Sequence, residues 1–380
     1  MAEVFTSYNS VISPLGFNTK DNLSALLSNS IGVKPVHFGK LNELFCLAVI
    51  NPSALQAHSS SVKHSEQFTK LELLSVLSIK DVLEQSGISL KDPKTLLIYS
   101  TTKGNIDLLE RGNYSGIPES RAYLSEMAGF IGNYFEAFHT PLVISNACIS
   151  GLLAIIHAKR LINAGYYDTI LVCGGDLVTE FTVSGFKSFN ALSTKPCKPF
   201  DAARDGINLG EAVACMIVTK DKALKTDTSL CILNGASAND ANHISGPSRT
   251  GDGLFKAIND TFKNFNSVKP DTINAHGTAT PYNDEMESIA FERCGLTHVP
   301  VNSLKGYYGH TLGAAGVLET IIAAESAHIN ELIYSAGYSE KGVSGTIEVI
   351  KANQQTPINH VLKTASGFGG CNAAALFSKF

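Results

Sequence analysis

Hydrophobic positions along the chain gather in short unbroken runs instead of alternating with polar ones. Runs of this kind are typical of strands that are buried on both faces, as in parallel sheets covered by helices. Glycine-rich or helical sequence separates them, and this order predicts an α/β fold. The predicted strands lie at 95–101, 141–146, 169–175, 211–219, 229–237, 272–278, 299–305 and 360–370.

A polar, charged stretch at 219–229 separates two apolar-rich halves of the 380-residue chain. A chain of this length exceeds the usual size of a single core. We therefore expect two domains, residues 1–220 and residues 221–380. In α/β sheets, ligand sites lie beyond the carboxyl ends of the strands, so candidate site residues are sought where each run stops.

The segment "LVISNACISGLLAII" (142–156) is apolar at both ends and polar at its centre. It predicts a strand followed by a helix over 148–164, with Cys148 in the first helical turn. Unpaired N–H groups and the helix dipole at that place favour a thiolate and lower the pKa of a thiol. Cys148 is therefore a candidate nucleophile, although an inert core cysteine explains this stretch equally well when it is considered alone.

Two later strand ends carry histidines. His276 follows one apolar run and precedes Asp284 and Glu287, whereas His310 precedes a helix rich in glycine and alanine. A helix N-terminus beside His310 would disfavour the protonated imidazole, and a neutral imidazole can donate a hydrogen bond to an oxyanion. Each histidine alone also fits a structural role, and Lys305, considered alone, fits a surface cation.

A glycine-rich turn, "SGFGG" (366–370), ends the last predicted strand. Glycines permit unusual backbone angles and expose N–H groups, which an oxyanion hole requires. One cysteine, two histidines and this turn, each at a strand end, together predict a nucleophile, a base and an oxyanion hole.

Composition narrows the class of protein. A net charge of −4 without a long basic run argues against nucleic acid as a partner. Eight cysteines stand singly, without a CxxC pair, which argues against disulfides and structural zinc. The apolar stretches 142–156 and 311–324 are interrupted by polar residues, and the first thirty residues lack a signal-peptide pattern. We expect a soluble, cytoplasmic protein without membrane contact.

Five motifs resemble those of β-ketoacyl-acyl-carrier-protein synthases, the condensing enzymes with a Cys-His-His triad (KAS I/II type). They occur in the order and at the separations found in that family, and cover nearly the whole chain. The resemblance implies the thiolase-like fold, a five-layered α-β-α-β-α sandwich of two similar halves. The motifs are "NACISG" (146–151), "KPFDAARDGINLGEA" (198–212), "NAHGTATPYNDEMES" (274–288), "NSLKGYYGHTLGAAGVLE" (302–319) and "GFGGCNAA" (367–374).

The resemblance also implies roles for individual residues and no metal or cofactor, because the acyl carrier protein brings its own phosphopantetheine. Cys148 would accept an acyl chain, and both histidines would stabilise the enolate formed when malonyl-carrier protein loses carbon dioxide. The implied residues are Cys148, His276, His310 and Lys305 as catalytic, Phe368 and Gly369 in the oxyanion hole and gate, and Glu319, Glu287 and Asp284 as supporting.

The partners implied are the acyl carrier protein and a second subunit, either an identical copy or a paralogue similar to a chain-length factor. Two alternatives stay open: a thiolase acting on coenzyme A thioesters, and a chain-length-factor-like subunit. The turn departs from the family pattern, since Ser366 replaces the first Phe of FGFGG and Cys371 stands where Thr or His is common. We hypothesise that Ser366 alters the pocket mouth for a specialised acyl chain, such as a polyene or aryl chain.

Overall fold

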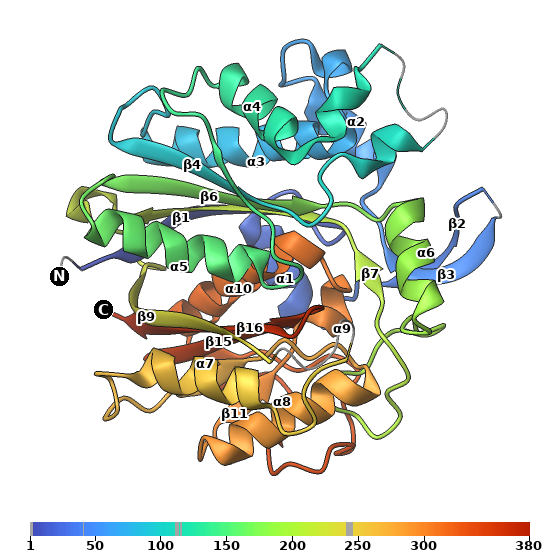
Figure 1. Cartoon of the computed structure of the whole chain (residues 1–380), viewed down its shortest axis with the longest axis vertical. Helices are drawn as coiled ribbons and strands as arrows, with labels where there is room; N and C mark the ends of the chain where they lie inside the picture. Colours follow the sequence, from blue (N-terminus) through green and yellow to red (C-terminus); the bar gives the residue numbers. More distant parts are fainter. Residues whose placement is uncertain (1–2, 41, 111–113, 115, 241–245) are drawn as a thin grey trace.

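The computed structural model describes residues 3–40, 42–110, 114, 116–240 and 246–380. Five layers of helices and sheets follow one another from top to bottom in Figure 1. The predicted thiolase-like α-β-α-β-α architecture is therefore confirmed. The helices of the outer and central layers are α2 (Pro52–Ser59), α3 (Lys70–Ser86) and α4 (Leu124–Tyr134) above, α5 (Ser150–Asn163) and α10 (Ala315–Ile329) in the centre, and α7 (Asp252–Phe262) and α8 (Pro281–Arg293) below.

The upper and lower sheets share one strand order. In each, the first strand of the half pairs antiparallel with the fifth, the fifth pairs antiparallel with the fourth, and the rest pair parallel. The upper order is β5 (Leu142–Ile144), β4 (Thr95–Ser100), β6 (Thr169–Asp176), β8 (Ala212–Thr219) and β1 (Phe5–Ile12). The lower order is β11 (Pro300–Asn302), β10 (Thr272–Asn274), β15 (His360–Gly367), β16 (Cys371–Lys379) and β9 (Leu230–Asn239).

The two sheets meet at the pair Phe5–Cys231, and β13 (Glu348–Val349) extends the lower sheet beyond β11. The polar stretch at 219–229 is the connection from β8 to β9. The division into domains at residue 220 stays a prediction, although the repeated strand order gives each half a sheet of its own.

The third strand of each half leads into the central layer, β5 into α5 and β11 into α10. These helices approach closely at their N-terminal ends, where three glycines lie. A Cβ on Gly316 would stand 2.1 Å from the backbone nitrogen of Leu152, and one on Gly151 would stand 2.9 Å from the carbonyl oxygen of Gly313. Side chains at these positions would force the two helices apart.

The other elements cap the site end or cover the edges. The cap consists of β2 (Lys34–Phe38), β3 (Glu43–Ala48), β7 (Leu209–Gly210) and α6 (Glu180–Ser188). The remaining elements are α1 (Thr19–Leu27), α9 (Lys305–Tyr308), β12 (Glu331–Leu332), β14 (Gln354–Gln355) and the 3-10 helices Ser65–Gln67, Ile106–Leu109, Glu119–Ala122, Lys222–Leu224 and Leu312–Ala314.

Burial confirms most of the predicted strands and corrects two, because β9 is buried only at Leu230 and Ile232 and is half-buried or exposed at its other residues. Every residue of β4, β6 and β8 is buried, as unbroken apolar runs predict. The expectation of burial on both faces is wrong for β5, where Leu142 is 41% exposed and its two neighbours are half-buried. The reason is position, because β5 is the edge strand of the sheet.

The prediction that the apolar stretch at 311–324 cannot span a membrane also needs correction. Leu312–Ile329 is long and apolar enough to cross one by length and composition, despite Glu319, but 83% of it is buried inside the protein. Its apolar character is explained by the central layer, where α10 packs between two sheets.

Candidate active site

Cys148 lies between β5 and α5, at the end of the central layer. The helix begins at Ser150, with Ile149 as its N-cap, so the prediction that Cys148 lies in the first helical turn is wrong. Ala147, just before it, has a positive φ of 44°, which turns the chain sharply between strand and helix. The Ser150 hydroxyl holds this turn by donating to the Ala147 carbonyl and accepting from the Asn146 N–H.

The expected low pKa of the thiol is also contradicted. Burial raises the pKa of Cys148 to about 12, the thiol of Cys371 adds to the rise, and Lys305 and a hydrogen bond from the Phe368 backbone N–H only partly oppose it. The side chain is only 7% exposed, so loss of solvation outweighs the favourable placement. The resting residue is a neutral thiol, and a base must take its proton when it attacks.

His276 and His310 lie beside this thiol, as the sequence predicted. One side-chain ligand atom from each of the three residues lies within 4.8 Å of the others, and the imidazole rings meet edge to face at a centroid distance of 5.1 Å. Burial lowers the pKa of both histidines well below 6.5, and Lys305 and Lys363 lower it further. Both imidazoles are therefore neutral at neutral pH, with burial and the lysines as the causes instead of the expected helix terminus.

The tautomer of His310 is fixed by the backbone. The Leu312 N–H donates to Nδ1 of His310 over 3.2 Å, which places the proton on Nε2. Among the described residues Nε2 has no hydrogen-bond partner, although it is buried and His310 lines the site cavity. His310 thus presents an N–H donor to whatever occupies the cavity.

The His276 loop is anchored by Glu287 and Asp284 of α8. Glu287 accepts from the backbone N–H groups of His276 (2.9 Å) and Gly277 (2.6 Å). Asp284 accepts from the N–H groups of Thr278 (2.8 Å) and, on its other oxygen, Phe200 (2.7 Å). Burial raises the pKa of both carboxyl groups, and their hydrogen bonds to backbone donors oppose the rise.

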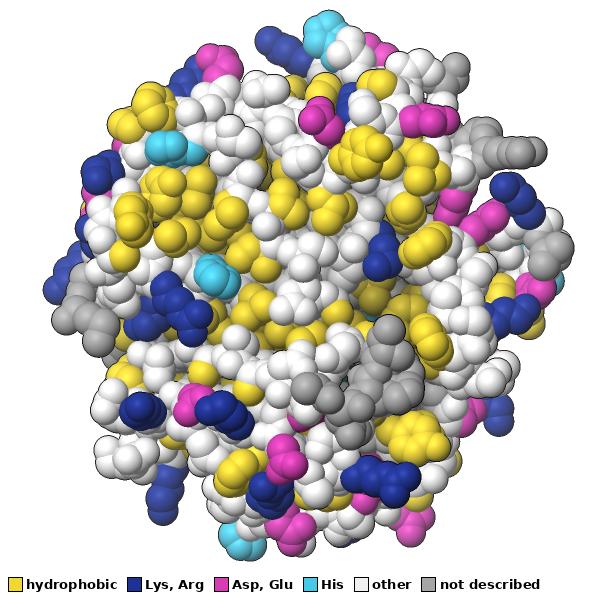
Figure 2. Space-filling model, in the orientation of Figure 1, with side chains coloured by type: hydrophobic (Ala, Val, Ile, Leu, Met, Phe, Trp, Pro, Cys, Tyr) yellow, Lys and Arg dark blue, Asp and Glu magenta, His cyan; other side chains and the backbone are white. Residues whose placement is uncertain are grey.

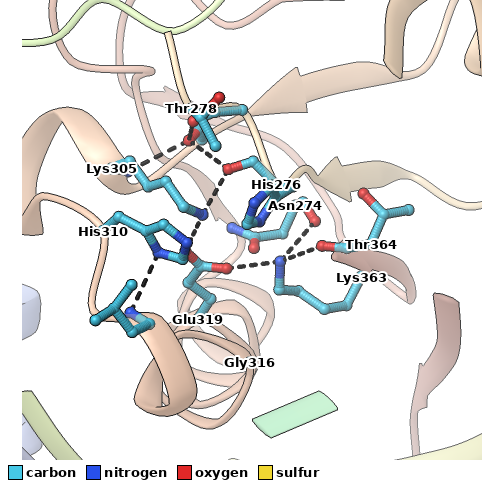
Figure 3. Close-up of polar contacts among 12 residues, drawn as sticks. Asn274, His276, Thr278, Lys305, His310, Gly316, Glu319, Lys363 and Thr364 are labelled. Carbon is cyan, nitrogen blue, oxygen red and sulfur yellow. Dashed lines mark hydrogen bonds and ion pairs between the residues drawn. The ribbon is translucent and has the colours of Figure 1, made fainter. Parts of the chain in front are cut away.

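Behind the histidines lies a buried ion cluster, which Figure 3 shows. Glu319 of α10 binds Nζ of Lys305 at 2.8 Å and Nζ of Lys363 at 2.7 Å. Burial opposes ionisation of Glu319, but the two ammonium groups outweigh it and lower the pKa. Lys305 also donates to the His276 carbonyl over 2.5 Å and is fully buried, so it is not the surface cation that this lysine, considered alone, would fit.

The motif at 198–212 supports both histidine loops. The Asn208 carbonyl accepts from the His310 N–H over 2.7 Å, while Phe200 binds Asp284 as described above.

Four apolar residues of the described chain have positive φ, a conformation that suits glycine and asparagine better. All four flank this site, where surrounding contacts hold them in place: Ala147, Phe200, Ala279 and Leu312.

The glycine-rich turn lies against Cys148. A Cβ on Gly367 would stand 3.0 Å from the Cys148 backbone nitrogen, and Gly369 and Gly370 have positive φ. The Phe368 ring is 38% exposed and stacks on Phe186 at a centroid distance of 5.4 Å. The turn thus brings backbone N–H groups near the sulfur and an aromatic ring over the opening.

A cavity of about 580 Å³ connects the triad with the surface, and its lining includes Cys148, His276, His310, Ser366 and Phe368. Ser366 is buried and donates to Asn372 over 2.7 Å. The opening is bounded by Phe189 and Tyr282, which are 54% and 77% exposed. This volume suits an extended chain that enters from solvent and ends at the sulfur.

Cysteine and histidine are also zinc ligands, and these three come from segments far apart in the sequence. The absence of a CxxC pair therefore does not by itself argue against such a donor set. Two buried ammonium groups behind the histidines would repel a divalent cation, and the expectation of no metal stays a prediction.

Sequence reasoning missed Lys363 and the aromatic partners of Phe368. Lys363 had a recognisable signal: it is a single charge inside the otherwise apolar and small strand sequence "HVLKTASG". The partners, Phe186 and Phe189, are spaced three residues apart in "SGFKSFN", as neighbours on one helix face are. The sequence pattern did not show which segment these two rings would contact.

Comparisons with known proteins agree with this geometry. The family model of the β-ketoacyl synthase N-terminal domain matches residues 50–223, and that of the C-terminal domain matches residues 230–335. A putative mitochondrial 3-oxoacyl-[acyl-carrier-protein] synthase of Schizosaccharomyces pombe is 27% identical, over 97% of each chain. A 3-oxoacyl-[acyl-carrier-protein] synthase 2 of Coxiella burnetii is 26% identical, over 97% of this chain and 96% of the relative.

Solved structures share the fold. A ketosynthase in complex with its chain length factor from Xenorhabdus doucetiae superposes with a TM-score of 0.88 at 24% identity, over 100% of this chain and 98% of that one. Since both family models match in order and full-length relatives align from end to end, the chain belongs to the β-ketoacyl synthase family of acyltransferases.

Proposed function

We propose that this chain condenses an acyl group held on Cys148 with malonyl-acyl-carrier protein, with loss of carbon dioxide. The observation that carries the proposal is the cluster of one thiol and two neutral imidazoles at the inner end of the cavity. A thiol can form the covalent acyl intermediate. Neutral imidazole N–H groups can stabilise the negative charge of an enolate by hydrogen bonding, without being protonated themselves.

In the first half-reaction, the Cys148 sulfur attacks the carbonyl carbon of an acyl-carrier-protein thioester. Its proton passes to a neighbouring imidazole, since the thiol pKa is about 12 and the histidines are neutral. The backbone N–H groups of Cys148 and Phe368 hold the developing oxyanion, and Gly369 with its positive φ shapes the turn beside them. The carbon–sulfur bond of the thioester then breaks, and the departing phosphopantetheine thiol takes the proton.

In the second half-reaction, malonyl-carrier protein occupies the same cavity. The carbon–carbon bond to the carboxylate breaks, carbon dioxide leaves, and the electron pair moves into the thioester as an enolate. His310 donates from Nε2 to the enolate oxygen with His276 beside it, and Lys305 supplies positive charge behind them. The enolate carbon attacks the acyl-cysteine, and the Cys148 sulfur leaves as a thiolate, which takes one proton from solvent.

Phe368 is proposed as the gate between the half-reactions. Its half-exposed ring lies at the cavity and stacks on aromatic rings of α6 and of the residue after it, and an apolar ring can turn without breaking a hydrogen bond of its own. The proposed chemistry needs no metal or organic cofactor of the chain itself.

The proposed protein partners are the acyl carrier protein and a second subunit of the same fold. Among the described residues β5 is an edge strand of the sheet, and this supports the second partner, because edge strands with exposed apolar side chains tend to pair with another chain. On the face seen in Figure 2, hydrophobic side chains gather over the upper sheet and central layer. Sedimentation of the chain, alone and with a chain-length-factor-like paralogue, distinguishes an identical from a different partner.

The two alternatives predict different behaviour. A thiolase would turn over acetyl-coenzyme A alone, without a malonyl donor. A chain-length-factor-like subunit would not take up an acyl group on a cysteine. The presence of Cys148 beside the two histidines favours an active subunit.

The test is mass spectrometry of the chain trapped on Cys148 and on the carrier protein, using a panel of acyl donors with malonyl-carrier protein. The proposal expects an acyl adduct on Cys148 and a product longer by two carbons on the carrier protein. No adduct with any donor would contradict it. The preferred donor also decides between a fatty acid, a polyene and a polyketide product.

A further inference from the structure

Lys363 is the buried cation that the reaction described above leaves unused. It lies on β15, three residues before Ser366 of the glycine-rich turn, and its side chain is fully buried. An ammonium group in such a place is costly unless it is paired and hydrogen-bonded. Its contacts therefore show what holds the charge there.

Three elements of the site meet at the Lys363 ammonium group. Nζ donates to the carbonyl of Thr364 over 2.6 Å and to that of Asn274 over 3.2 Å, and it binds the Glu319 carboxylate at 2.7 Å. Asn274 ends β10, two residues before His276, and Glu319 comes from α10. Figure 3 shows Lys363 reaching these groups on the side of Glu319 away from Lys305.

The next residue on β15 reaches His276 by a second route. The Thr364 hydroxyl donates to Oε1 of Glu287 over 3.2 Å, and the same oxygen accepts the His276 backbone N–H over 2.9 Å. Lys363 thus holds the Asn274 carbonyl, and Thr364, through Glu287, holds the backbone N–H of His276. This pair fixes the position of His276 relative to the turn that carries Phe368.

Charge at the back of the site depends on Lys363 as well. Burial lowers the pKa of Lys363, and its ion pair with Glu319 opposes this change. Glu319 alone would neutralise Lys305, so a protonated Lys363 gives the cluster of these three residues one net positive charge. A positive charge behind an imidazole disfavours its protonation and favours negative charge on the substrate side. Lys363 contributes to the low pKa of both histidines, after burial and Lys305.

We propose that Lys363 is a positioning residue of the decarboxylation step: it fixes the strand end that carries His276 and supplies the second positive charge behind both histidines. This inference rests on the proposed function. Besides Lys363, titratable groups from several elements surround the histidines, and the Lys363 variants leave all of these groups unchanged. These groups are Cys148, Lys305, Glu319, Glu287, Asp284, Asp205 and Asp240.

The test removes the charge in two ways. Lys363→Met removes the charge and the donors, whereas Lys363→Gln keeps amide donors for the carbonyls and should fold even where the methionine variant does not. Lys363→Arg keeps the charge. Lys159→Met is the control, because Lys159 is half-buried and its Nζ also donates to a backbone carbonyl, that of Ile232, away from the histidines.

Two measurements are made on each variant. Carbon dioxide release from malonyl-carrier protein is followed from pH 5 to 9, and histidine titrations are followed by NMR with His276→Gln and His310→Gln spectra for assignment. In Lys363→Gln we expect release about tenfold slower at pH 6 and an acid limb that moves up by about half a pH unit or more. Both histidine pKa values should rise, Lys363→Arg should restore most of the rate, and Lys159→Met should change neither.

The inference is overturned if Lys363→Gln leaves the acid limb and both histidine titrations unchanged. It is also overturned if acylation of Cys148 and carbon dioxide release fall by one common factor without a pH shift, as a purely structural role predicts. Failure of the proposed function looks different, since the wild-type chain would then release no carbon dioxide although the histidine titrations still moved in Lys363→Gln.

Discussion

In the N-terminal half, residues 145–149 connect the third strand to the central helix, and this short turn carries the thiol. In the C-terminal half the equivalent connection, residues 303–314, is longer and carries Lys305 and His310. The two sheets have the same strand order and orientation. One scaffold used twice therefore brings a nucleophile from one half to a set of donors and charges from the other.

The contrast extends to the other strand ends. In the upper sheet, Asp176 at the end of β6 accepts from the backbone N–H groups of Thr102 and Gly313 and so anchors loops. In the lower sheet, the ends of β10 and β15 lead into His276 and the glycine-rich turn. In the proposed mechanism the N-terminal half holds the acyl group and the C-terminal half stabilises negative charge, so changes in the two halves should damage different half-reactions.

The largest expected effect separates the halves directly. Cys148→Ala should reduce condensation by about a thousandfold or more, because the thiol proposed to hold the acyl group is lost. Carbon dioxide release from malonyl-carrier protein should stay measurable, since the histidines are intact. Product analysis and carbon dioxide release on one preparation check this, and loss of both reactions would show that the division between halves is wrong.

Removing a donor from the other half should have the opposite pattern. His310→Ala should slow carbon dioxide release by about 100-fold to 1,000-fold, because an oriented N–H donor to the enolate is lost. Transfer of a labelled acyl group to Cys148 should remain detectable. His139→Ala is the control, since His139 is half-buried, is not part of the cavity lining and bonds the Pro93 carbonyl. Normal carbon dioxide release from His310→Ala would refute the role of His310.

The contact between the halves is tested by Gly316→Ala. Its Cβ would stand 2.1 Å from the Leu152 backbone nitrogen, so α5 and α10 must move apart. The free energy of unfolding should fall by about 2–4 kcal/mol, as measured by urea denaturation. Gly129→Ala on α4 meets nothing within 4 Å and should not destabilise. Equal stability of the two variants would contradict close packing of the central helices.

The pH dependence tests the charge in the C-terminal half. Both histidines stay neutral in the folded chain below pH 6.5, whereas the unfolded chain takes up protons there. Unfolding is therefore favoured as the pH falls below 6.5, by up to about 1.4 kcal/mol per pH unit for each buried histidine. Urea denaturation at pH 7.5 and 5.5 measures this, with His276→Gln/His310→Gln as the control. An unchanged difference in the control would show that other groups carry the effect.

The smallest expected effect concerns the pocket mouth. Ser366 is buried in the cavity wall and donates to Asn372, so Ser366→Phe should break that bond and narrow the passage. We expect the ratio of kcat/KM between a long and a short acyl donor to change by about threefold or more. An unchanged ratio would end the hypothesis that Ser366 adapts the pocket to a specialised acyl chain.

Much of the site could be predicted because each residue stands at a strand end with a recognisable motif. Cys148, His276, His310 and the glycine-rich turn were found in this way, and the lower sheet brings the two histidines together as expected. The pKa of Cys148 was predicted in the wrong direction. Local sequence reports the nearby helix terminus, but it does not report how far tertiary packing excludes water from the thiol.

Lys305 and Lys363 show the same limit. Considered alone, a lysine is expected at the surface, and only the assembled fold places both ammonium groups on one buried carboxylate. The exposure of β5 also depends on strand order, because its apolar run looks like that of the fully buried β6.

By itself, then, the sequence determined the class of fold, the two-part organisation of apolar runs and the residues able to perform the chemistry. These depend on local periodicity and on motifs, which are properties of short segments. Tertiary structure decided the protonation states, the pairing of buried charges, the exposed edge and the close approach of α5 to α10. These depend on groups that are distant in the chain, whose desolvation and electrostatic interactions arise only when the two halves pack together.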